Sequence, residues 1–327
     1  MATSRADFVG HSGGSRNLGV GICQSSGRDY LNMQEAFAAY ESARHRLPPV
    51  SAQGACIRHP NLDAIADKMD TFFLDAFGVL NIGETAISGV PERVARLQKA
   101  GKRVMIVSNA AGFPHAHLMK KYARLGYNFA PEDVITSRKT LLHGLQAEPE
   151  RHWGLMATES FGRADIEHLN VTYLAEDPAT YDAVDAFLFV GSAKWTEERQ
   201  ALLEASLLKT PRPVYVGNPD IVAPRENGFS TEPGSYAHRL ANRTGVSPEF
   251  FGKPFGNIFN LAFAQLDQPD PARIVMVGDS LHTDILGGQV AGVKTALIAG
   301  FGFFSGTDVT DPINTSGIFP DFILERP

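Results

Sequence analysis

The 327-residue sequence predicts an α/β protein in which a parallel sheet is interrupted by a second α/β unit. Short apolar runs alternate with amphipathic helical segments, which is the pattern of parallel strands joined by helical crossovers. This alternation restarts near Arg138 and again near Phe251. We therefore assign residues 68–137 and 247–327 to a core unit, and residues 138–246 to a unit inserted in it.

Residues 1–67 are predicted to be an N-terminal extension with one short helix. Residues 1–32 are rich in glycine and serine and show no periodicity, so we expect weak order there. From Gln34 to Leu47 apolar side chains recur on one helical face, and Pro48-Pro49 ends the helix. The residues on that face are Phe37, Tyr40, Ala43 and Leu47.

The core unit is expected to hold short buried strands, each a continuous apolar run bounded by polar or turn residues. The strands are Thr71–Asp75, Val104–Val107, Ile274–Val277, Lys294–Ile298 and Phe322–Leu324. The helices between them are Pro91–Ala100, His115–Leu125 and Asp284–Ala291. Residues Asn81–Glu84 have the composition of a turn and are expected to form a small flap after the first strand.

The inserted unit repeats the same kind of pattern. Its predicted strands are Trp153–Ala157, Ala186–Val190 and Pro213–Val216, and its predicted helices are Glu197–Lys209 and Ser235–Arg243.

Composition limits the classes of function. Hydrophobic residues make up 43% of the chain and charged residues 20%, which suits a globular core. The net charge is −6 and no basic block occurs, so we expect neither nucleic acid nor a membrane surface as a partner. Only Cys23 and Cys56 are present, without a CxxC pair, so a cytoplasmic protein without disulfides or a thiolate zinc site is expected.

Polar residues gather where the predicted topology brings strand ends together. Asp75 and Ser108 each end a core strand, and Asp279 follows another, with Asp284 close behind it. Lys253 lies in a loop just after the core resumes. Because the carboxyl ends of parallel strands meet at one edge of a sheet, we expect these five side chains to share one site.

This set of residues suits phosphoryl transfer. Asp75 is the candidate nucleophile, and a divalent cation bridging Asp75 and Asp279 would reduce its repulsion from a phosphate dianion. Magnesium accepts such oxygen ligands. Ser108 and the adjacent amide can hydrogen-bond phosphoryl oxygens, Lys253 can neutralise charge, and Asp284 can orient Lys253. Taken singly, each residue has a simpler explanation as a helix cap, a turn residue or a solvated loop lysine.

The order of these motifs resembles the haloacid dehalogenase superfamily of phosphohydrolases. It is most similar to the subclass (class IIA) whose cap domain lies between the second and third motifs, which includes sugar-phosphate, phosphoglycolate and pyridoxal-phosphate phosphatases. The matching core segments are Leu74–Leu80, Val107-Ser108-Asn109, Gly252-Lys253-Pro254, and Val277-Gly278-Asp279 with Thr283-Asp284. The matching cap segments are Asn218-Pro219-Asp220 and Pro233-Gly234-Ser235.

The resemblance implies a Rossmann-like core with an inserted α/β cap, and a magnesium-dependent phosphatase acting on a small phosphorylated metabolite through an aspartyl-phosphate. The implied catalytic residues are Asp75, Ser108, Lys253 and Asp284. The implied substrate-binding residues are Asn109, Asp220, Gly234 and Ser235. The implied metal ligands are Asp75, Asp279 and the backbone carbonyl of Phe77. Caps of this subclass often mediate dimers, so the resemblance also implies a homodimer.

One position departs from the family pattern. Phosphatases of the superfamily usually carry a second aspartate two residues after the nucleophile, which protonates the leaving alcohol; here that residue is Phe77. Three interpretations follow: a phosphatase with a low-pKa leaving group or another acid, such as His282 or a cap residue; an enzyme with dehalogenase-like chemistry that needs no such acid; or a non-catalytic phospho-ligand binder. Dehalogenases place their cap between the first two motifs, whereas only residues 76–107 separate Asp75 from Ser108 here.

Overall fold

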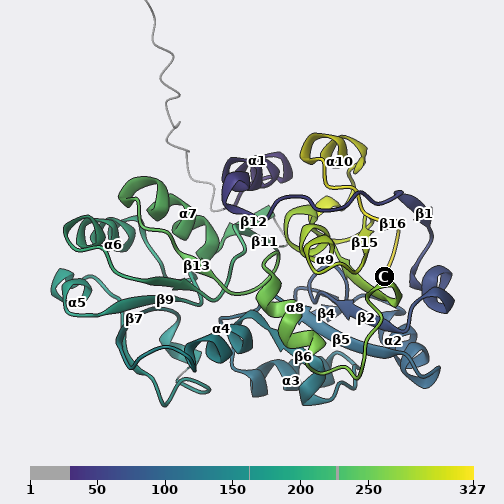
Figure 1. The fold of residues 1–327 in the computed structure, drawn as a ribbon, viewed down its shortest axis with the longest axis horizontal. Coiled ribbons are helices and arrows are strands. Elements are labelled where there is room, and N and C mark those ends of the chain that lie inside the picture. The colour runs from purple at the N-terminus through teal and green to yellow at the C-terminus, as the bar shows by residue number, and fades with distance from the viewer. Residues whose placement is uncertain (1–29, 162, 226–227) are drawn as a thin grey trace, which may run out of the picture.

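The computed structural model describes residues 30–161, 163–225 and 228–327, so most of the predicted weakly ordered segment 1–32 lies outside the described residues. Two α/β units lie side by side (Figure 1). No helix within the described ranges has the length and apolar character needed to cross a membrane.

The core unit is built on a parallel sheet with strand order β1-β16-β15-β14-β2-β5-β6. Its strands are β1 (Ile57–His59), β2 (Thr71–Leu74), β5 (Arg103–Ser108), β6 (Val134–Thr136), β14 (Ile274–Gly278), β15 (Lys294–Ile298) and β16 (Phe322–Leu324). Its helices are α2 (Val90–Lys99), α3 (His115–Arg124), α8 (Gly256–Phe263), α9 (Leu286–Val290) and α10 (Thr310–Ser316). The predicted α/β fold is therefore confirmed.

Central strand β2 shows why these runs are continuously apolar. Successive side chains point to opposite faces of a strand, and both faces of this sheet are covered. Phe72 packs with residues of α2 and α3 on one face, and Phe73 packs with Ile258 and Phe259 of α8 on the other. Burial on both sides fixes β2 at the centre of the sheet, so the residue that follows it emerges at the sheet edge.

The second unit also contains a parallel sheet, with strand order β13-β10-β9-β7-β8. Its strands are β7 (His152–Met156), β8 (Asn170–Tyr173), β9 (Ala186–Phe189), β10 (Val214–Val216) and β13 (Glu249–Phe250). Its helices are α4 (Ser137–Leu145), α5 (Pro178–Asp182), α6 (Glu197–Lys209) and α7 (Pro233–Thr244). Helices α6 and α7 pack on one face of the sheet, and α4 packs on the other.

Two predicted boundaries need correction. Strand β13 belongs to the second sheet, so the predicted end of the inserted unit at residue 246 is too early. Strand β1 pairs with β16 at the edge of the core sheet, so the predicted extension 1–67 already contains part of the core. Both strands are very short, and β1 is largely exposed, so neither has a run of apolar residues that predicts it.

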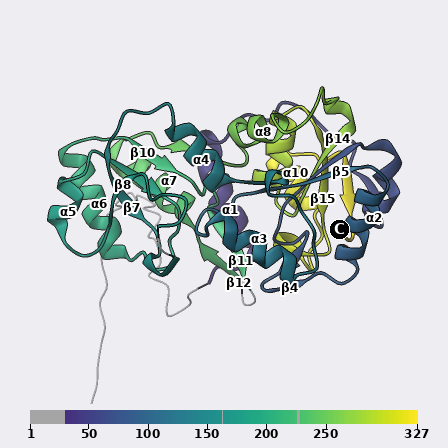
Figure 2. The same ribbon diagram turned by 90° about the horizontal axis from the view of Figure 1, so that it is seen from below.

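Two short hairpins complete the fold. The predicted flap is the hairpin of β3 (Asn81–Ile82) and β4 (Thr85–Ala86). A second hairpin, β11 (Val222–Arg225) with β12 (Gly228–Thr231), lies between the two units beside α1 (Met33–Ala43) in both Figure 1 and Figure 2.

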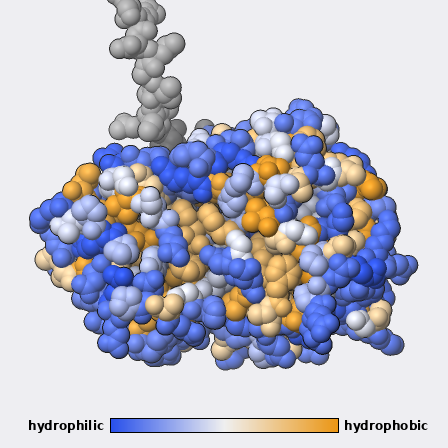
Figure 3. Space-filling model, viewed as in Figure 1, coloured by the Kyte–Doolittle hydropathy of each residue, from blue (hydrophilic) through white to orange (hydrophobic). Residues whose placement is uncertain are grey.

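Helix α1 connects the two units. Asn32 and Glu35 form a reciprocal capping box that begins the helix. The predicted helix Gln34–Leu47 ends earlier, at Ala43, and a 3-10 turn follows it. Tyr40, Ala43 and Leu47 are buried in a cluster that includes residues of hairpin β11–β12 and of the core segment after β14. The surface on this side is largely hydrophilic, with apolar side chains gathered towards the middle, where the units meet (Figure 3).

Candidate active site

A cavity of about 490 Å³ opens where the two units face each other. The ends of the core strands form one wall, with Asp75, Ser108 and Asp279. Hairpin β11–β12 and the turn after β10 form the opposite wall, and Tyr40 of α1 contributes a third side. The strand ends that were predicted to lie together therefore line one cavity.

Three carboxylates converge on the core side of the cavity. Asp75 follows β2, Asp279 follows the adjacent strand β14, and Asp284 lies in the π-helical turn Leu281–Ile285. One oxygen from each lies within 4.8 Å of the others, an arrangement that could hold a metal ion. Such π-turns are frequent at functional sites, and this one turns Asp284 back towards β14.

Lys253 lies between two of these carboxylates. Its Nζ donates to Oδ1 of Asp75 and to Oδ1 of Asp284, each at 2.6 Å. Burial lowers the pKa of Lys253, but the two carboxylates outweigh burial and hold this pKa above its ordinary value. The lysine is therefore charged, and it fixes the orientation of Asp75.

The carboxylates carry more negative charge than one lysine can balance. Burial raises the pKa of Asp284 to about 6, against the opposing effect of Lys253. Burial, followed by the charges of Asp284 and Asp75, raises the pKa of Asp279 well above its ordinary value. A divalent cation with oxygen ligands would compensate this excess, so the residues present fit magnesium.

Two glycines allow close approach to Asp279. Gly78 and Gly302 both have positive φ, and a Cβ on them would lie 2.5 Å and 1.9 Å from Oδ2 of Asp279. The same oxygen accepts a hydrogen bond from the Phe303 amide at 2.8 Å. The Asp279 carboxylate is thus held from behind by backbone, while Phe77 lines the cavity two residues after Asp75.

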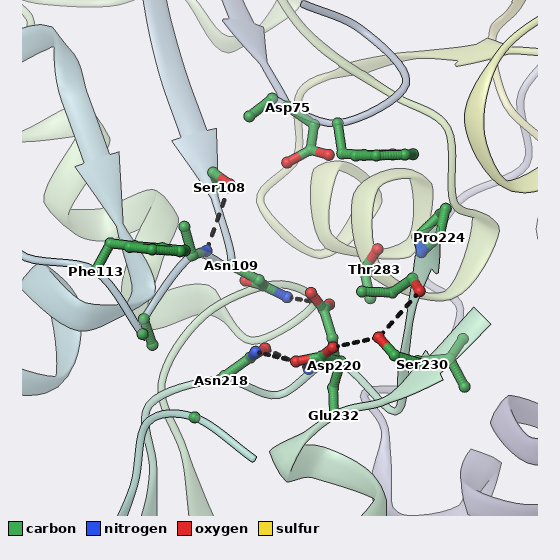
Figure 4. A pocket seen from close by; sticks show the side chains of 18 of the residues that line it. Asp75, Ser108, Asn109, Phe113, Asn218, Asp220, Pro224, Ser230, Glu232 and Thr283 are labelled. Carbon is green, nitrogen blue, oxygen red and sulfur yellow. Dashed lines mark hydrogen bonds between the residues drawn. The ribbon is translucent and has the colours of Figure 1, made fainter. Parts of the chain in front are cut away.

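Asn109 is engaged by the protein on both sides of its amide. Its Nδ2 donates to Oδ1 of Asp220 at 2.8 Å and to the Lys253 carbonyl at 2.9 Å. Its Oδ1 accepts from the Lys253 amide at 2.7 Å. The structure thus brings Asn109 and Asp220 together, as Figure 4 shows, and gives the Asn109 side chain a positioning role beside Ser108.

Gly234 and Ser235 are not among the described residues that line the cavity, although both were predicted to bind substrate. The Gly234 amide donates to the Asp220 carbonyl at 3.0 Å. A Cβ on Gly234 would lie 2.1 Å from the Pro219 carbonyl oxygen. This glycine allows α7 to begin directly against the turn that carries Asp220, so it supports that turn from behind.

His282 is also absent from the described cavity lining, so the suggestion that it faces the site is wrong. Its ring stacks on Tyr40, with centroids 5.0 Å apart, and its Nε2 lies 2.5 Å from Oε1 of Glu41. Burial lowers the pKa of His282, and Glu41 opposes this shift. The histidine therefore anchors α1 to the core.

Sequence reasoning missed the residues that close the cavity. Tyr40 was expected on an apolar helix face, but nothing in the sequence indicated that this face meets the site. Ser230 and Glu232 line the opposite wall from hairpin β11–β12 and its exit. The Asn227-Gly228 dipeptide, shortly after the apolar run of residues 221–224, is a turn signal that could have located this wall.

Comparison with known proteins shows the family of the chain. Residues 72–169 match the family model described as haloacid dehalogenase-like hydrolase, and residues 250–325 match the model described as HAD-hydrolase-like. Glycerol-3-phosphate phosphatase of Gallus gallus is 30% identical, over 80% of this chain and 91% of that protein. Chronophin of Mus musculus is 31% identical, over 75% of this chain and 84% of that protein.

Solved structures agree on the fold. A possible sugar phosphatase from Cytophaga hutchinsonii superposes with a TM-score of 0.72 at 24% identity, over 83% of this chain and 98% of that one. The p-nitrophenyl phosphatase from Archaeoglobus fulgidus superposes with a TM-score of 0.65 at 22% identity, over 79% and 96%. The family-model matches and the curated relatives show that the chain belongs to the haloacid dehalogenase-like hydrolase superfamily.

Proposed function

We propose that this protein is a magnesium-dependent phosphatase that hydrolyses a small phosphorylated metabolite through a phosphoryl group carried on Asp75. The observation that carries the proposal is the contact of Lys253 with Asp75 and Asp284, next to the third carboxylate, Asp279. Named relatives that are phosphatases, among them glycerol-3-phosphate phosphatase and chronophin, support the reaction class.

In the first half of the reaction, an oxygen of Asp75 attacks phosphorus and the bond to the leaving oxygen breaks. Because Oδ1 of Asp75 accepts from Lys253, we assign the attack to Oδ2. Ser108 ends β5 and lines the cavity, and we assign its hydroxyl to donate to a phosphoryl oxygen. Asp284 holds Lys253 in position, so the lysine charge stays on the attacking carboxylate.

In the second half, water attacks phosphorus, releases inorganic phosphate and regenerates Asp75. Magnesium, held by Asp75, Asp279 and the Phe77 carbonyl, would supply positive charge that reduces repulsion between Asp75 and the phosphate. The protein's own part is to position Asp75 and to limit access of bulk water to the cavity through Tyr40 and the opposite hairpin wall.

The size of the cavity supports a small substrate. A volume of about 490 Å³ lies in the range of pockets for small molecules, about 300–1,000 Å³. The lining combines apolar side chains, such as Phe113 and Val222, with polar groups, such as Ser230 and Glu232. We infer that the organic part of the substrate lies against these residues, away from the carboxylates.

The test is a magnesium-dependent assay of the full chain against aryl, alkyl and acyl phosphates and 2-haloacids. We expect phosphate release that requires magnesium and falls to background in Asp75→Asn, which keeps an oxygen that can accept from Lys253. Asp70→Asn, a change at an exposed carboxylate paired with Arg273, is the matched control and should keep full activity. Retained activity in Asp75→Asn would exclude the covalent step. Binding of phosphate without turnover of any substrate would indicate a non-catalytic binder.

A further inference from the structure

The proposed reaction needs a proton for the leaving oxygen, and Phe77 cannot provide one. The described cavity lining contains two carboxyl groups outside the converging set, Asp220 and Glu232. We propose that Asp220, on the turn after β10, is the catalytic acid that protonates the leaving group. This inference rests on the proposed phosphatase function and adds to it the residue that replaces the missing aspartate.

Asp220 lies on the side of the cavity towards which the leaving group departs (Figure 4). Phosphoryl transfer places the attacking and leaving oxygens roughly in line, on opposite sides of phosphorus. In Figure 4 the carboxyl groups of Asp75 and Asp220 lie on opposite sides of the open space and point towards each other. A phosphoryl group attacked by Asp75 therefore directs its leaving oxygen towards Asp220.

Asp220 is held in one orientation by hydrogen bonds. Its Oδ1 accepts from Nδ2 of Asn109 at 2.8 Å, and its backbone amide donates to Oδ1 of Asn218 at 3.1 Å. Asn109 is itself fixed by the backbone of Lys253. With Oδ1 serving as the acceptor, Oδ2 is the oxygen of Asp220 that is left to carry a proton.

The surroundings of Asp220 favour its protonated form near neutral pH. Burial raises the pKa of Asp220 to about 7; the Asn109 hydrogen bond and the Lys253 charge oppose this rise, and the charges of Asp75 and Glu232 add to it. Tyr40 of α1 also faces this turn, through the hydrogen bond that its hydroxyl accepts from the Ile221 amide. An acid with a pKa near the working pH is the kind that general acid catalysis favours.

The other titratable groups in the lining fit this role less well. Both oxygens of Glu232 accept hydrogen bonds: Oε1 from Arg225 at 2.8 Å and from Ser230 at 2.7 Å, and Oε2 from Asn218 at 3.3 Å. Burial raises the pKa of Glu232, and the Ser230 hydrogen bond and Arg225 oppose this rise. Because both of its oxygens are already engaged as acceptors, neither is left to carry a proton towards the substrate. Burial, followed by the charge of Asp220, raises the pKa of Tyr40 well above its ordinary value, so its hydroxyl is a poor acid.

Asp220 gives its proton to the leaving oxygen in the first half of the reaction and regains one from water in the second. The bond from phosphorus to Oδ2 of Asp75 forms while the bond to the leaving oxygen breaks, and the proton on Oδ2 of Asp220 passes to that oxygen. A neutral alcohol leaves, and Asp220 remains as a carboxylate. Asp220 then accepts a proton from the water that attacks phosphorus, which releases inorganic phosphate and restores both aspartates.

The test compares leaving groups in Asp220→Asn, which keeps an oxygen that can accept from Asn109 but has no transferable carboxyl proton. With magnesium, we expect kcat/KM for glycerol phosphate, an alkyl ester, to fall by about 10²-fold or more. The value for 4-nitrophenyl phosphate, whose leaving group needs no proton, should change by less than about tenfold. Glu232→Gln, at the other carboxyl group of the lining, is the comparison variant: any loss of substrate binding should lower both rates alike and keep the native ratio of alkyl to aryl rates. Asp70→Asn, away from the cavity, is the control for full activity.

A pH profile supplies a second readout. Native kcat/KM for the alkyl ester should fall as pH rises above about 7, because Asp220 loses its proton, and this limb should be absent in Asp220→Asn. Equal losses for both esters would overturn the acid role and leave Asp220 as a positioning residue for Asn109. An unchanged alkyl rate in Asp220→Asn would also overturn the acid role. The same would follow if Glu232→Gln, rather than Asp220→Asn, lost alkyl turnover selectively. If the native chain hydrolyses the aryl ester, the phosphatase proposal stands and these outcomes concern Asp220 alone. If the native chain hydrolyses neither ester, the phosphatase proposal and the acid role of Asp220 are both overturned.

Discussion

Replacing Lys253 by methionine should destabilise the metal-free protein strongly, because the lysine is the cation between two buried carboxylates. Its side chain is only 2% exposed, and that of Asp284 is 1% exposed. Methionine matches the length of the stem but carries no charge. The variant therefore leaves Asp75, Asp279 and Asp284 facing one another without the ammonium group that balances them.

Removing one partner of a buried ion pair costs about 3–5 kcal/mol, because the remaining charge stays buried and uncompensated. Lys294→Met is the matched control. Lys294 contacts Asp321 at 2.8 Å, but these side chains are 44% and 22% exposed. A pair so close to solvent contributes at most about 1 kcal/mol, so the two lysine variants should differ by at least about 2 kcal/mol.

The assay is urea unfolding of both variants in metal-free buffer and in magnesium. We expect magnesium to stabilise Lys253→Met more than the native chain, because the cation then meets three carboxylates without a competing ammonium group. The loss of unfolding free energy in Lys253→Met, relative to the native chain, should also become smaller at acidic pH. Asp284 has a folded-state pKa of about 6, above its ordinary value of 3.8, so its favourable contribution is full below about pH 4 and is lost as pH rises through 6.

The titration of Lys253 itself does not contribute to this pH dependence. The pKa of Lys253 is raised in the folded state, so its contribution is fully present below its ordinary value of 10.5 and does not change between about pH 5 and pH 8. Any change of the deficit in that range therefore reports the carboxylates. A deficit below about 1 kcal/mol, or one equal to that of Lys294→Met, would refute this account of the site.

Three further outcomes are expected. Magnesium should raise the Tm of the native chain but not that of Asp279→Asn; equal shifts by differential scanning fluorimetry would exclude Asp279 as a ligand. Gly302→Ala should weaken magnesium binding by about tenfold or more in calorimetry, because its Cβ would displace Asp279; Gly306→Ala, also at positive φ but with open space around it, should bind magnesium normally. In urea unfolding, Asp220→Asn should become more stable relative to the native chain as pH rises from about 4 to about 8. The reason is that the folded-state pKa of Asp220, about 7, lies above its ordinary value of 3.8, so the native chain loses stability over that range. A difference in unfolding free energy that does not change with pH would show that Asp220 is not protonated there.

The sequence carried enough information to predict the core of the site. Asp75, Ser108 and Asp279 each follow an apolar run, and a parallel sheet brings such positions to one edge. Helix Glu197–Lys209 and strands Lys294–Ile298 and Phe322–Leu324 match the predicted ranges, because their capping residues and apolar runs are local signals. Local signals of this kind do not depend on what packs against them.

The residues that could not be predicted depend on contacts between distant segments. Asn109 was expected to bind substrate, but its amide is engaged by Asp220 and Lys253, which lie more than a hundred residues further along the chain. Gly234 appeared to be a binding residue, whereas its importance lies in the space it leaves for the Pro219 carbonyl. Periodicity and spacing cannot report such packing, because it arises only when the two units are placed together.

Helix α1 gives the junction between the units a third point of support. The chain itself passes between the units twice, near Ser137 and near Phe251. Two crossings alone would allow rotation about the line that joins them. Helix α1 is fastened to the core through Glu41 and His282, and the segment just after it is fastened to α7 through Arg46, which donates to Asn242 at 2.6 Å. With this third connection, we expect the two units to rotate against each other only if α1 and the segment after it detach from one of them.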